Sequence, residues 1–174
     1  MKDLVNKRAA KIAVVMGSKS DFEVMKECAK VLADFHIPHE IRVISAHRTP
    51  ERAHEFASTA EERGLQLIIA AAGKAAHLAG VLAASTTVPI LGVPMTTSDL
   101  GGLDSLLSMV QMPGGIPVGT VTIGKTGAKN AALLAVAILA LSDGHLRDEL
   151  KAYRQRMQQE VEAADAEVFQ SSLC

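Results

Sequence analysis

The chain has few aromatic residues and few cysteines, and each scarcity narrows what it can be. Aromatic residues make up 3% of the 174 residues and tryptophan is absent, which argues against the stacking platforms that bind single-stranded nucleic acid. Two cysteines, Cys28 and Cys174, are too few for a disulfide framework. Eighteen basic residues nearly balance nineteen acidic ones, so net charge draws the chain neither to nucleic acid nor to an anionic membrane.

Long apolar runs are also missing. None reaches the roughly 18 residues that a membrane span requires, and the charged residues 1–10 lack the apolar segment of a secretory signal. We therefore expect a cytoplasmic protein with residues 1–10 as a frayed lead-in. The length, with 48% hydrophobic residues, predicts a single domain over residues 1–174.

Short apolar runs alternate with helical patterns along most of the chain. Strands are expected at residues 11–16, 40–44, 67–72, 89–93 and 118–123. Helices are expected from residue 22 to about 35, from residue 50 to about 64, and over residues 128–141. Between the last two of these we expect a short helix that ends at about residue 85 and another that includes residues 106 and 107. Runs that are apolar throughout are typical of strands buried on both faces of a parallel sheet. The alternation predicts an α/β fold, a three-layer α/β/α sandwich of flavodoxin-like type with about five parallel strands.

The last segment, about residues 143–169, differs from this core of about residues 11–142. It is polar with a narrow apolar stripe, which predicts an extra C-terminal amphipathic helix. The stripe consists of Leu146, Leu150, Tyr153, Met157 and Val161. Because the helix follows a completed sandwich, we expect it to contact a neighbouring subunit; packing on its own domain is the alternative.

The first candidate site segment follows the first strand and consists of Gly17, Ser18, Lys19, Ser20 and Asp21. Glycine permits a tight turn, and hydroxyl and N–H groups converge at a helix start, as in phosphate sites. Asp21 would repel phosphate, so it suits ribose hydroxyls better. Plain capping of the next helix by Ser20 or Asp21 explains the segment equally well.

The second segment, Ser45-Ala46-His47-Arg48-Thr49-Pro50, follows the second strand. Its arginine offers a planar fork for phosphate, and its histidine can give and take a proton near neutrality. Thr49 can cap the following helix, with Pro50 in its first position. An ordinary surface His-Arg pair is the alternative. Since carboxyl ends of parallel strands bind ligands, we interpret both segments as a phosphorylated-sugar site.

The third segment follows the third strand and contributes Gly73, Lys74, Ala75, His77 and Leu78. Its small residues let the backbone approach a ligand closely. His77 is either a second site group or a cap for the next helix, and capping is favoured here.

Metal-binding patterns are missing from the sequence. There is no H-E-x-x-H motif and no cysteine cluster, so we expect no catalytic metal. Residues 119–126 match the letter pattern of a phosphate-binding P-loop, but 120–123 are expected to be strand, and the match falls at the last strand rather than the first.

Several segments together resemble one enzyme family. They are GSKSD (17–21), SAHRTP (45–50), AAHL (75–78), LGVP (91–94), DSLLSMVQMPGGIPVGT (104–120) and AKNAALLA (128–135). In this order they resemble the catalytic component of phosphoribosylaminoimidazole carboxylase, whose bacterial members are N5-carboxyaminoimidazole ribonucleotide mutases of purine biosynthesis. The resemblance covers roughly residues 11–142.

The resemblance implies a flavodoxin-like subunit of a homo-octamer that moves a carboxylate from an exocyclic nitrogen to ring carbon C4 without a cofactor. By position, His47 would be the general acid and base. Arg48, Ser18 and Asp21 would hold the phosphoribosyl group. Ser45, Ala46 and the 73–78 loop would enclose the base and CO2.

The loop around Lys74 departs from the family pattern. Bacterial mutases usually have GAGGAAHLPG where this chain has AAGKAAHLAG at residues 71–80. Animal-type members, which carboxylate with free CO2, carry a basic residue at the position of Lys74, but they have SAHK where this chain has SAHR. Direct CO2-dependent carboxylation of aminoimidazole ribonucleotide is therefore the alternative reaction, and a non-catalytic phosphoribosyl-ligand binder is a further one. Lys74 itself could contact a carboxylate or point to solvent.

Overall fold

The computed structural model describes residues 10–172 and divides them between two compact units, residues 1–135 and 136–174 of the chain. Of the frayed lead-in expected at residues 1–10, only Ala10 belongs to the described residues. Cys174 also lies outside them. The expectation of one domain remains a prediction.

The first unit is built on a five-stranded parallel sheet, ordered β2-β1-β3-β4-β5. The strands are β1 (Ile12–Met16), β2 (His39–Val43), β3 (Leu67–Ala72), β4 (Ile90–Pro94) and β5 (Gly119–Thr120). The fully apolar runs β1, β3 and β4 are buried at every residue, while the edge strand β2 leaves Val43 47% exposed. Burial on both faces is thus confined to the sheet centre, as hydrophobic runs in parallel sheets require.

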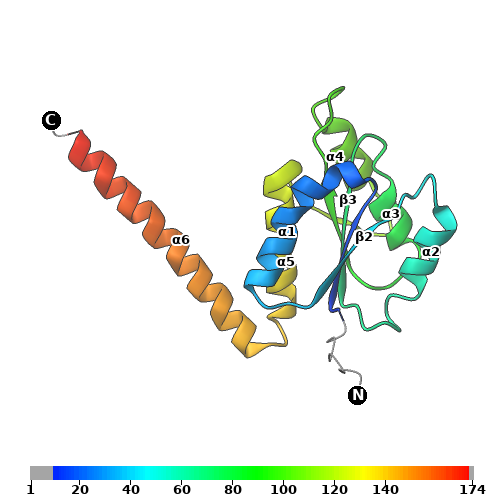
Figure 1. Cartoon of the computed structure of the whole chain (residues 1–174), viewed down its shortest axis with the longest axis horizontal. Coiled ribbons are helices and arrows are strands. Elements are labelled where there is room, and N and C mark those ends of the chain that lie inside the picture. Colours follow the sequence, from blue (N-terminus) through cyan, green and yellow to red (C-terminus); the bar gives the residue numbers. More distant parts are fainter. Residues whose placement is uncertain (1–9, 173–174) are drawn as a thin grey trace, which may run out of the picture. The chain divides into compact units, whose positions relative to one another are not determined.

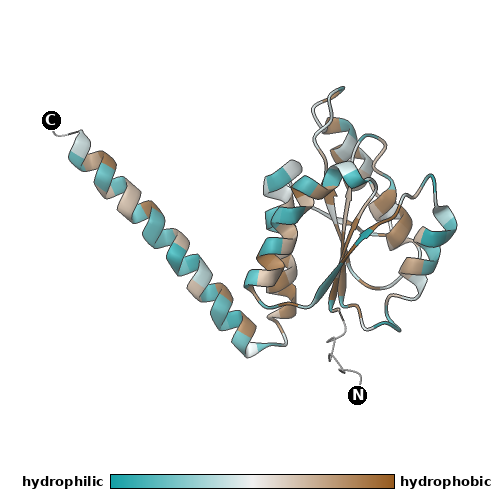
Figure 2. Ribbon diagram, viewed as in Figure 1, coloured by the Kyte–Doolittle hydropathy of each residue, from teal (hydrophilic) through white to brown (hydrophobic). Residues whose placement is uncertain are grey.

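Helices cover both faces of this sheet, as Figure 1 shows. They are α1 (Phe22–Asp34), α2 (Pro50–Ser58), α3 (Leu78–Ala83), α4 (Leu103–Val110) and α5 (Gly124–Leu139), with the short 3-10 helix η1 (Lys19–Asp21) before α1. Side chains alternate between the faces of a strand, so Ala13 and Val15 join the core under α2 and α3. The brown sheet and teal outer helix faces in Figure 2 show the same division. The predicted three-layer sandwich with five parallel strands is confirmed.

Small residues set the spacing of the layers. Ala128, Ala131, Ala132 and Ala135 repeat at helical spacing along α5, and all are fully buried. On the other face, a methyl group on Gly92 of β4 would lie 3.1 Å from Met109 of α4. Because these positions lack long side chains, helix backbones come close to the sheet.

Three predicted boundaries were wrong. The last strand, expected over 118–123, is limited to β5, because the chain turns after Thr120 and α5 begins at Gly124 rather than at 128. Because of that turn, a Cβ atom added to Gly127 would lie only 1.7 Å from the carbonyl oxygen of Thr122. The second helix ends at Ser58 rather than near Gly64, since residues 59–64 form turns that close at Gly64 with a φ of +79°.

The surface of α4 carries apolar side chains. Leu103, Leu107 and Val110 are 47–53% exposed, and Leu100 just before the helix is 63% exposed. Their 3-4-3 spacing puts them on one side of the helix. On its other side, Ser105 and Met109 are fully buried.

The second unit contains the predicted C-terminal helix, α6 (Gly144–Ser171). The side chain of Asp143 caps it by accepting a hydrogen bond from the Leu146 N–H at 3.1 Å. Met157 and Val161 of the predicted stripe are 47% and 70% exposed. Of the helices in residues 10–172, none combines the length and hydropathy that crossing a membrane would need.

The crowding at Gly127 generates a stability prediction. Gly127→Ala should lower the free energy of unfolding by about 3 kcal/mol or more, because a backbone carbonyl cannot yield as a side chain can. Gly144→Ala is the matched control at another helix start, where the new methyl group meets only the Arg147 side chain at 3.7 Å. Urea unfolding should show Gly144→Ala unchanged or slightly stabilised; equal stability of the two variants would contradict the close contact.

Candidate active site

Four loops leave the same edge of the sheet, each at the carboxyl end of a strand. Backbone hydrogen bonds continue the ladder into three of them: Gly17 N–H donates to the Ala71 carbonyl (2.9 Å), Ile44 N–H to Met16 (3.0 Å) and Met95 N–H to Ala72 (2.9 Å). The loops are thereby fixed at their first residues, and their side chains converge.

A cavity of about 590 Å³ lies between these loops. All predicted site residues line it: Gly17, Ser18, Ser20, Asp21, Ser45, Ala46, His47, Arg48, Gly73, Lys74, Ala75, His77 and Leu78. Sequence reasoning missed five further lining residues, Ala72, Met95, Thr96, Thr97 and Ser98. Four of these follow β4, so the strand-end rule that found the other loops would have found them too.

His47 and His77 connect the loop after β2 to the loop after β3. His47 Nε2 and His77 Nδ1 are 2.9 Å apart, and the rings meet edge to face with centroids 5.0 Å apart. One nitrogen must donate while the other accepts, so these two atoms hold a single proton between them. The capping role favoured for His77 was wrong, because its Nδ1 faces His47 instead of the start of α3.

The serine and threonine around Arg48 hold its loop in shape. Ser45 Oγ accepts hydrogen bonds from the Arg48 N–H (3.2 Å) and from its Nε (3.4 Å). Thr49 Oγ1 donates to the Ser45 carbonyl (2.9 Å) and accepts from the Ser45 N–H (3.2 Å). Thr49 therefore closes the loop on itself rather than capping α2, whereas Pro50 takes the first helical position as predicted.

Capping around the Gly17–Asp21 loop differs from the prediction. Asp21 stands at the N-cap position of α1 but makes no side-chain capping hydrogen bond there. Ser18 Oγ accepts hydrogen bonds from the Ser20 N–H (3.3 Å) and hydroxyl (2.9 Å), so Ser18 caps the short helix η1. The carboxylate of Asp21 stays on the cavity wall. Its partial burial raises its pKa above the ordinary 3.8, although hydrogen bonds from Ser20 and from the Ser18 backbone partly offset this. The fold thus retains a carboxylate whose ionised form it disfavours.

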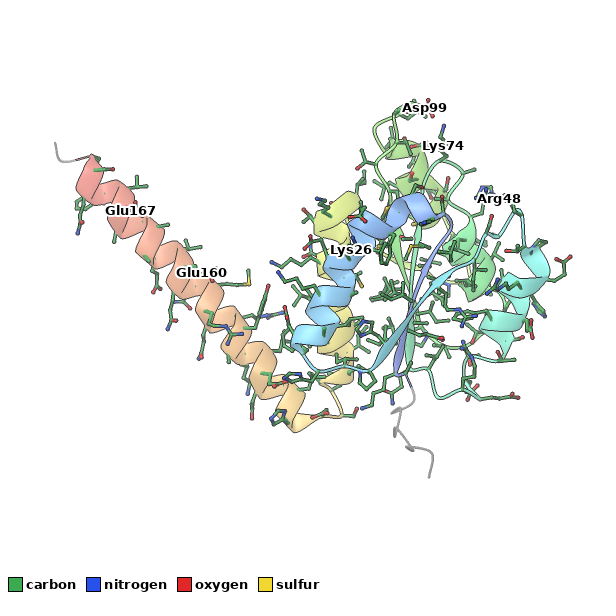
Figure 3. The ribbon with its side chains drawn as sticks, in the orientation of Figure 1. Lys26, Arg48, Lys74, Asp99, Glu160 and Glu167 are labelled. Atoms are coloured by element: carbon green, nitrogen blue, oxygen red, sulfur yellow. The ribbon has the colours of Figure 1, made fainter. Side chains whose placement is uncertain are left out.

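Lys74 contacts a carboxylate that belongs to the protein itself. Its ammonium donates a hydrogen bond to Asp99 in the loop between β4 and α4. Figure 3 shows Lys74 and Asp99 close together, with Arg48 at the same end of the sheet.

The donor set of this cavity consists of two imidazoles, one carboxylate, one guanidinium, one ammonium and several hydroxyls. Among residues 10–172, no three or more His, Cys, Asp or Glu side chains gather as metal ligands would. The set is suited to binding a phosphorylated polyol and to moving a proton.

Comparisons with known proteins agree with this geometry. The family model described as AIR carboxylase matches residues 11–160. The N5-carboxyaminoimidazole ribonucleotide mutase of Pyrococcus abyssi is 61% identical over 147 residues, covering 84% of this chain and 83% of that protein. The enzyme of the same name from Escherichia coli K12 is 54% identical over 152 residues, covering 87% and 90%.

A solved structure is similar as well. The crystal structure of Treponema denticola PurE matches with a TM-score of 0.80 at 30% identity, covering 90% of this chain and 96% of that one. Since the family model and relatives above half identity each span most of the sequence, this chain belongs to the AIR carboxylase family.

Proposed function

We propose that this chain is an N5-carboxyaminoimidazole ribonucleotide mutase of purine biosynthesis. The observation that carries the proposal is 54–61% identity, over 84–87% of the chain, to relatives that bear this name. The cavity supports it, because His47, Arg48, Ser18, Asp21, Ser45, Ala46 and all of the loop 73–78 except Ala76 line it.

The proposed reaction is an isomerisation in which the proton and the carboxylate each return to the substrate. His47 protonates the exocyclic nitrogen as the C–N bond breaks, releasing CO2 and aminoimidazole ribonucleotide within the cavity. The C4 carbon attacks the CO2, and neutral His47 then removes the C4 proton, which restores its starting form. Because one proton is shared with His77, we assign His77 to orienting the His47 ring.

The remaining residues bind and enclose in this proposal. Arg48 and Ser18 hold the phosphate, and Asp21 accepts hydrogen bonds from ribose hydroxyls. Ser45, Ala46 and the loop 73–78 surround the base and the transient CO2. Confinement matters because CO2 that diffuses away is lost to the reaction, whereas held CO2 is attacked at high effective concentration.

The reaction is tested by supplying each purine intermediate separately and following 4-carboxyaminoimidazole ribonucleotide. We expect turnover of N5-carboxyaminoimidazole ribonucleotide without added bicarbonate. His47→Asn should fold, bind the product, and lose about 10²- to 10⁴-fold in kcat, as expected for removal of a general acid and base.

Other outcomes would point to the alternatives. Turnover of aminoimidazole ribonucleotide only when bicarbonate is supplied in bulk would replace the mutase with a direct carboxylase. Binding without turnover, unaffected by His47→Asn, would leave a non-catalytic phosphoribosyl binder.

Asp21 generates a prediction about stability and affinity together. Its raised pKa means that folding penalises the ionised form, a cost present at neutral pH and absent well below the ordinary pKa of 3.8. Asp21→Asn should therefore raise the Tm at pH 7.5, with the gain vanishing near pH 3, where both states of the wild type are protonated. The same variant should bind product roughly tenfold more weakly, since a charged acceptor is lost. A lowered Tm together with unchanged affinity would remove Asp21 from this role.

We further propose a homo-octamer, with α6 contacting a neighbouring subunit and with the cytoplasm as its location. The exposed leucines of α4 and the stripe on α6 support assembly, because apolar patches of this kind mark contact surfaces. The octamer itself follows from the family resemblance.

The role of α6 can be tested by charge placement. Met157→Glu combined with Val161→Glu puts two charges on the apolar stripe, whereas Gln155→Glu with Gln159→Glu puts two on the opposite face of the same helix. Light scattering after size exclusion should show a lower mass for the stripe variant and an unchanged octamer for the control. An octamer in both would exclude α6 from the subunit contact.

A further inference from the structure

The ion pair between Lys74 and Asp99 joins two loops of the cavity, one after β3 and one after β4. Lys74 lines the cavity, but Asp99 is not among the residues of its wall. The side chains are 68% and 60% exposed, and both lie at the cavity end of the sheet in Figure 3. The lysine ammonium is therefore held on the rim, toward a carboxylate outside the site.

The backbone of Lys74 is held in an unfavourable conformation. Its φ is +59°, a left-handed region that costs an ordinary side chain free energy and favours glycine. The fully buried Ser105 Oγ accepts a hydrogen bond from the Lys74 N–H at 3.0 Å. Strain retained in a cavity wall indicates a task for the side chain.

The charge and the exposure of the Lys74–Asp99 pair allow another anion to take the place of Asp99. The Asp99 carboxylate raises the pKa of Lys74, and the Lys74 ammonium lowers the pKa of Asp99, so both are charged at neutral pH. Exposed pairs of this kind are weak, because water screens them and two long side chains must be ordered. An anion that enters the cavity can therefore replace Asp99 at the ammonium.

The other charged groups that line the cavity show why the substrate would need the Lys74 ammonium. Arg48 is the other basic side chain of the lining, and Asp21 is its one acidic side chain. The proposed substrate carries a phosphate and a carboxylate. Apart from His47, whose proton the proposed reaction transfers, a single guanidinium leaves one of these anionic groups without a cationic partner. Lys74 is the lining residue able to supply it, since its flexible stem starts in the wall.

We propose that Asp99 is an internal counter-ion that occupies Lys74 in the empty site and is displaced when an anionic oxygen group of the substrate binds the ammonium. The inference rests on the proposed function. It makes Lys74 a substrate-binding residue and Asp99 a residue that lowers affinity by competition.

A purely structural pair makes the opposite prediction. If Lys74 and Asp99 only hold the two loops in place, removing the Asp99 charge loosens the site and weakens binding. If Asp99 competes with the substrate, removing its charge frees the ammonium and tightens binding. The sign of one affinity change separates the two.

The experiment is a double-mutant cycle in the full chain, with His47→Asn present throughout to prevent turnover. Calorimetry measures binding of 4-carboxyaminoimidazole ribonucleotide to the parent, Asp99→Asn, Lys74→Met and the double variant. We expect Asp99→Asn to bind about two- to fivefold more tightly, Lys74→Met to bind more weakly, and Asp99→Asn to have no effect once Lys74 is Met.

Aminoimidazole ribonucleotide, which lacks the carboxylate, assigns the displaced contact. An equal gain for this ligand in Asp99→Asn places the substrate phosphate on Lys74; a gain confined to the carboxylated ligand places the carboxylate there. Asp148→Asn is the matched control, because Asp148 pairs with Lys151 in α6 at similar exposure, 77% and 68%, and its affinity should equal that of the parent.

Three results would overturn the inference. Weaker or unchanged binding in Asp99→Asn would make the pair structural, with the proposed function intact. A gain that persists in Lys74→Met, or that Asp148→Asn reproduces, would show a general charge effect. Failure of the parent to bind either nucleotide would overturn the proposed function, and this inference with it.

Discussion

The parallel register of β2, β1, β3 and β4 is the constraint on which the rest of the structure depends. Parallel strands send every carboxyl end to one edge of the sheet, so loops distant in sequence share a wall there. Met16, Ile44, Ala71 and Ala72 carry the ladder hydrogen bonds past the strands and fix where each loop starts. The burial of β1, β3 and β4 keeps this register, because a slip by one residue would invert every side chain.

Much of this could be predicted from the sequence, for a physical reason. Runs such as Leu67–Ala72 have apolar side chains on both faces of the strand, which suits only a strand that is covered on both faces. Knowing where such strands end was enough to predict three loops of the cavity. The β4 loop was missed because its threonines and Ser98 carry no motif, although its position follows the same rule.

The features that the sequence did not predict depend on a local turn of the chain or on contacts between residues far apart in the sequence. Val121–Ile123 alternate like a strand, but the chain must turn inward to start α5, and Gly127 leaves the space for that turn. Thirty residues separate His47 from His77, so their shared proton appears only when β1 brings the loops after β2 and β3 together. The partner of Lys74 was equally hidden, since Asp99 lies in the loop that was missed.

The placement of Ser105 has a consequence for how the subunit responds to its surroundings. One helix, α4, presents leucines to the exterior on one side and a fully buried hydroxyl to the Lys74 backbone on the other. A molecule that packs on those leucines and a ligand that binds Lys74 therefore act on the same rigid element. If either shifts α4, thermodynamic reciprocity requires each to alter the affinity of the other by the same factor. If the molecule that packs on those leucines is a second copy of the chain, a higher protein concentration would change the affinity of the site for its ligand, and ligand binding would change the tendency of the copies to associate.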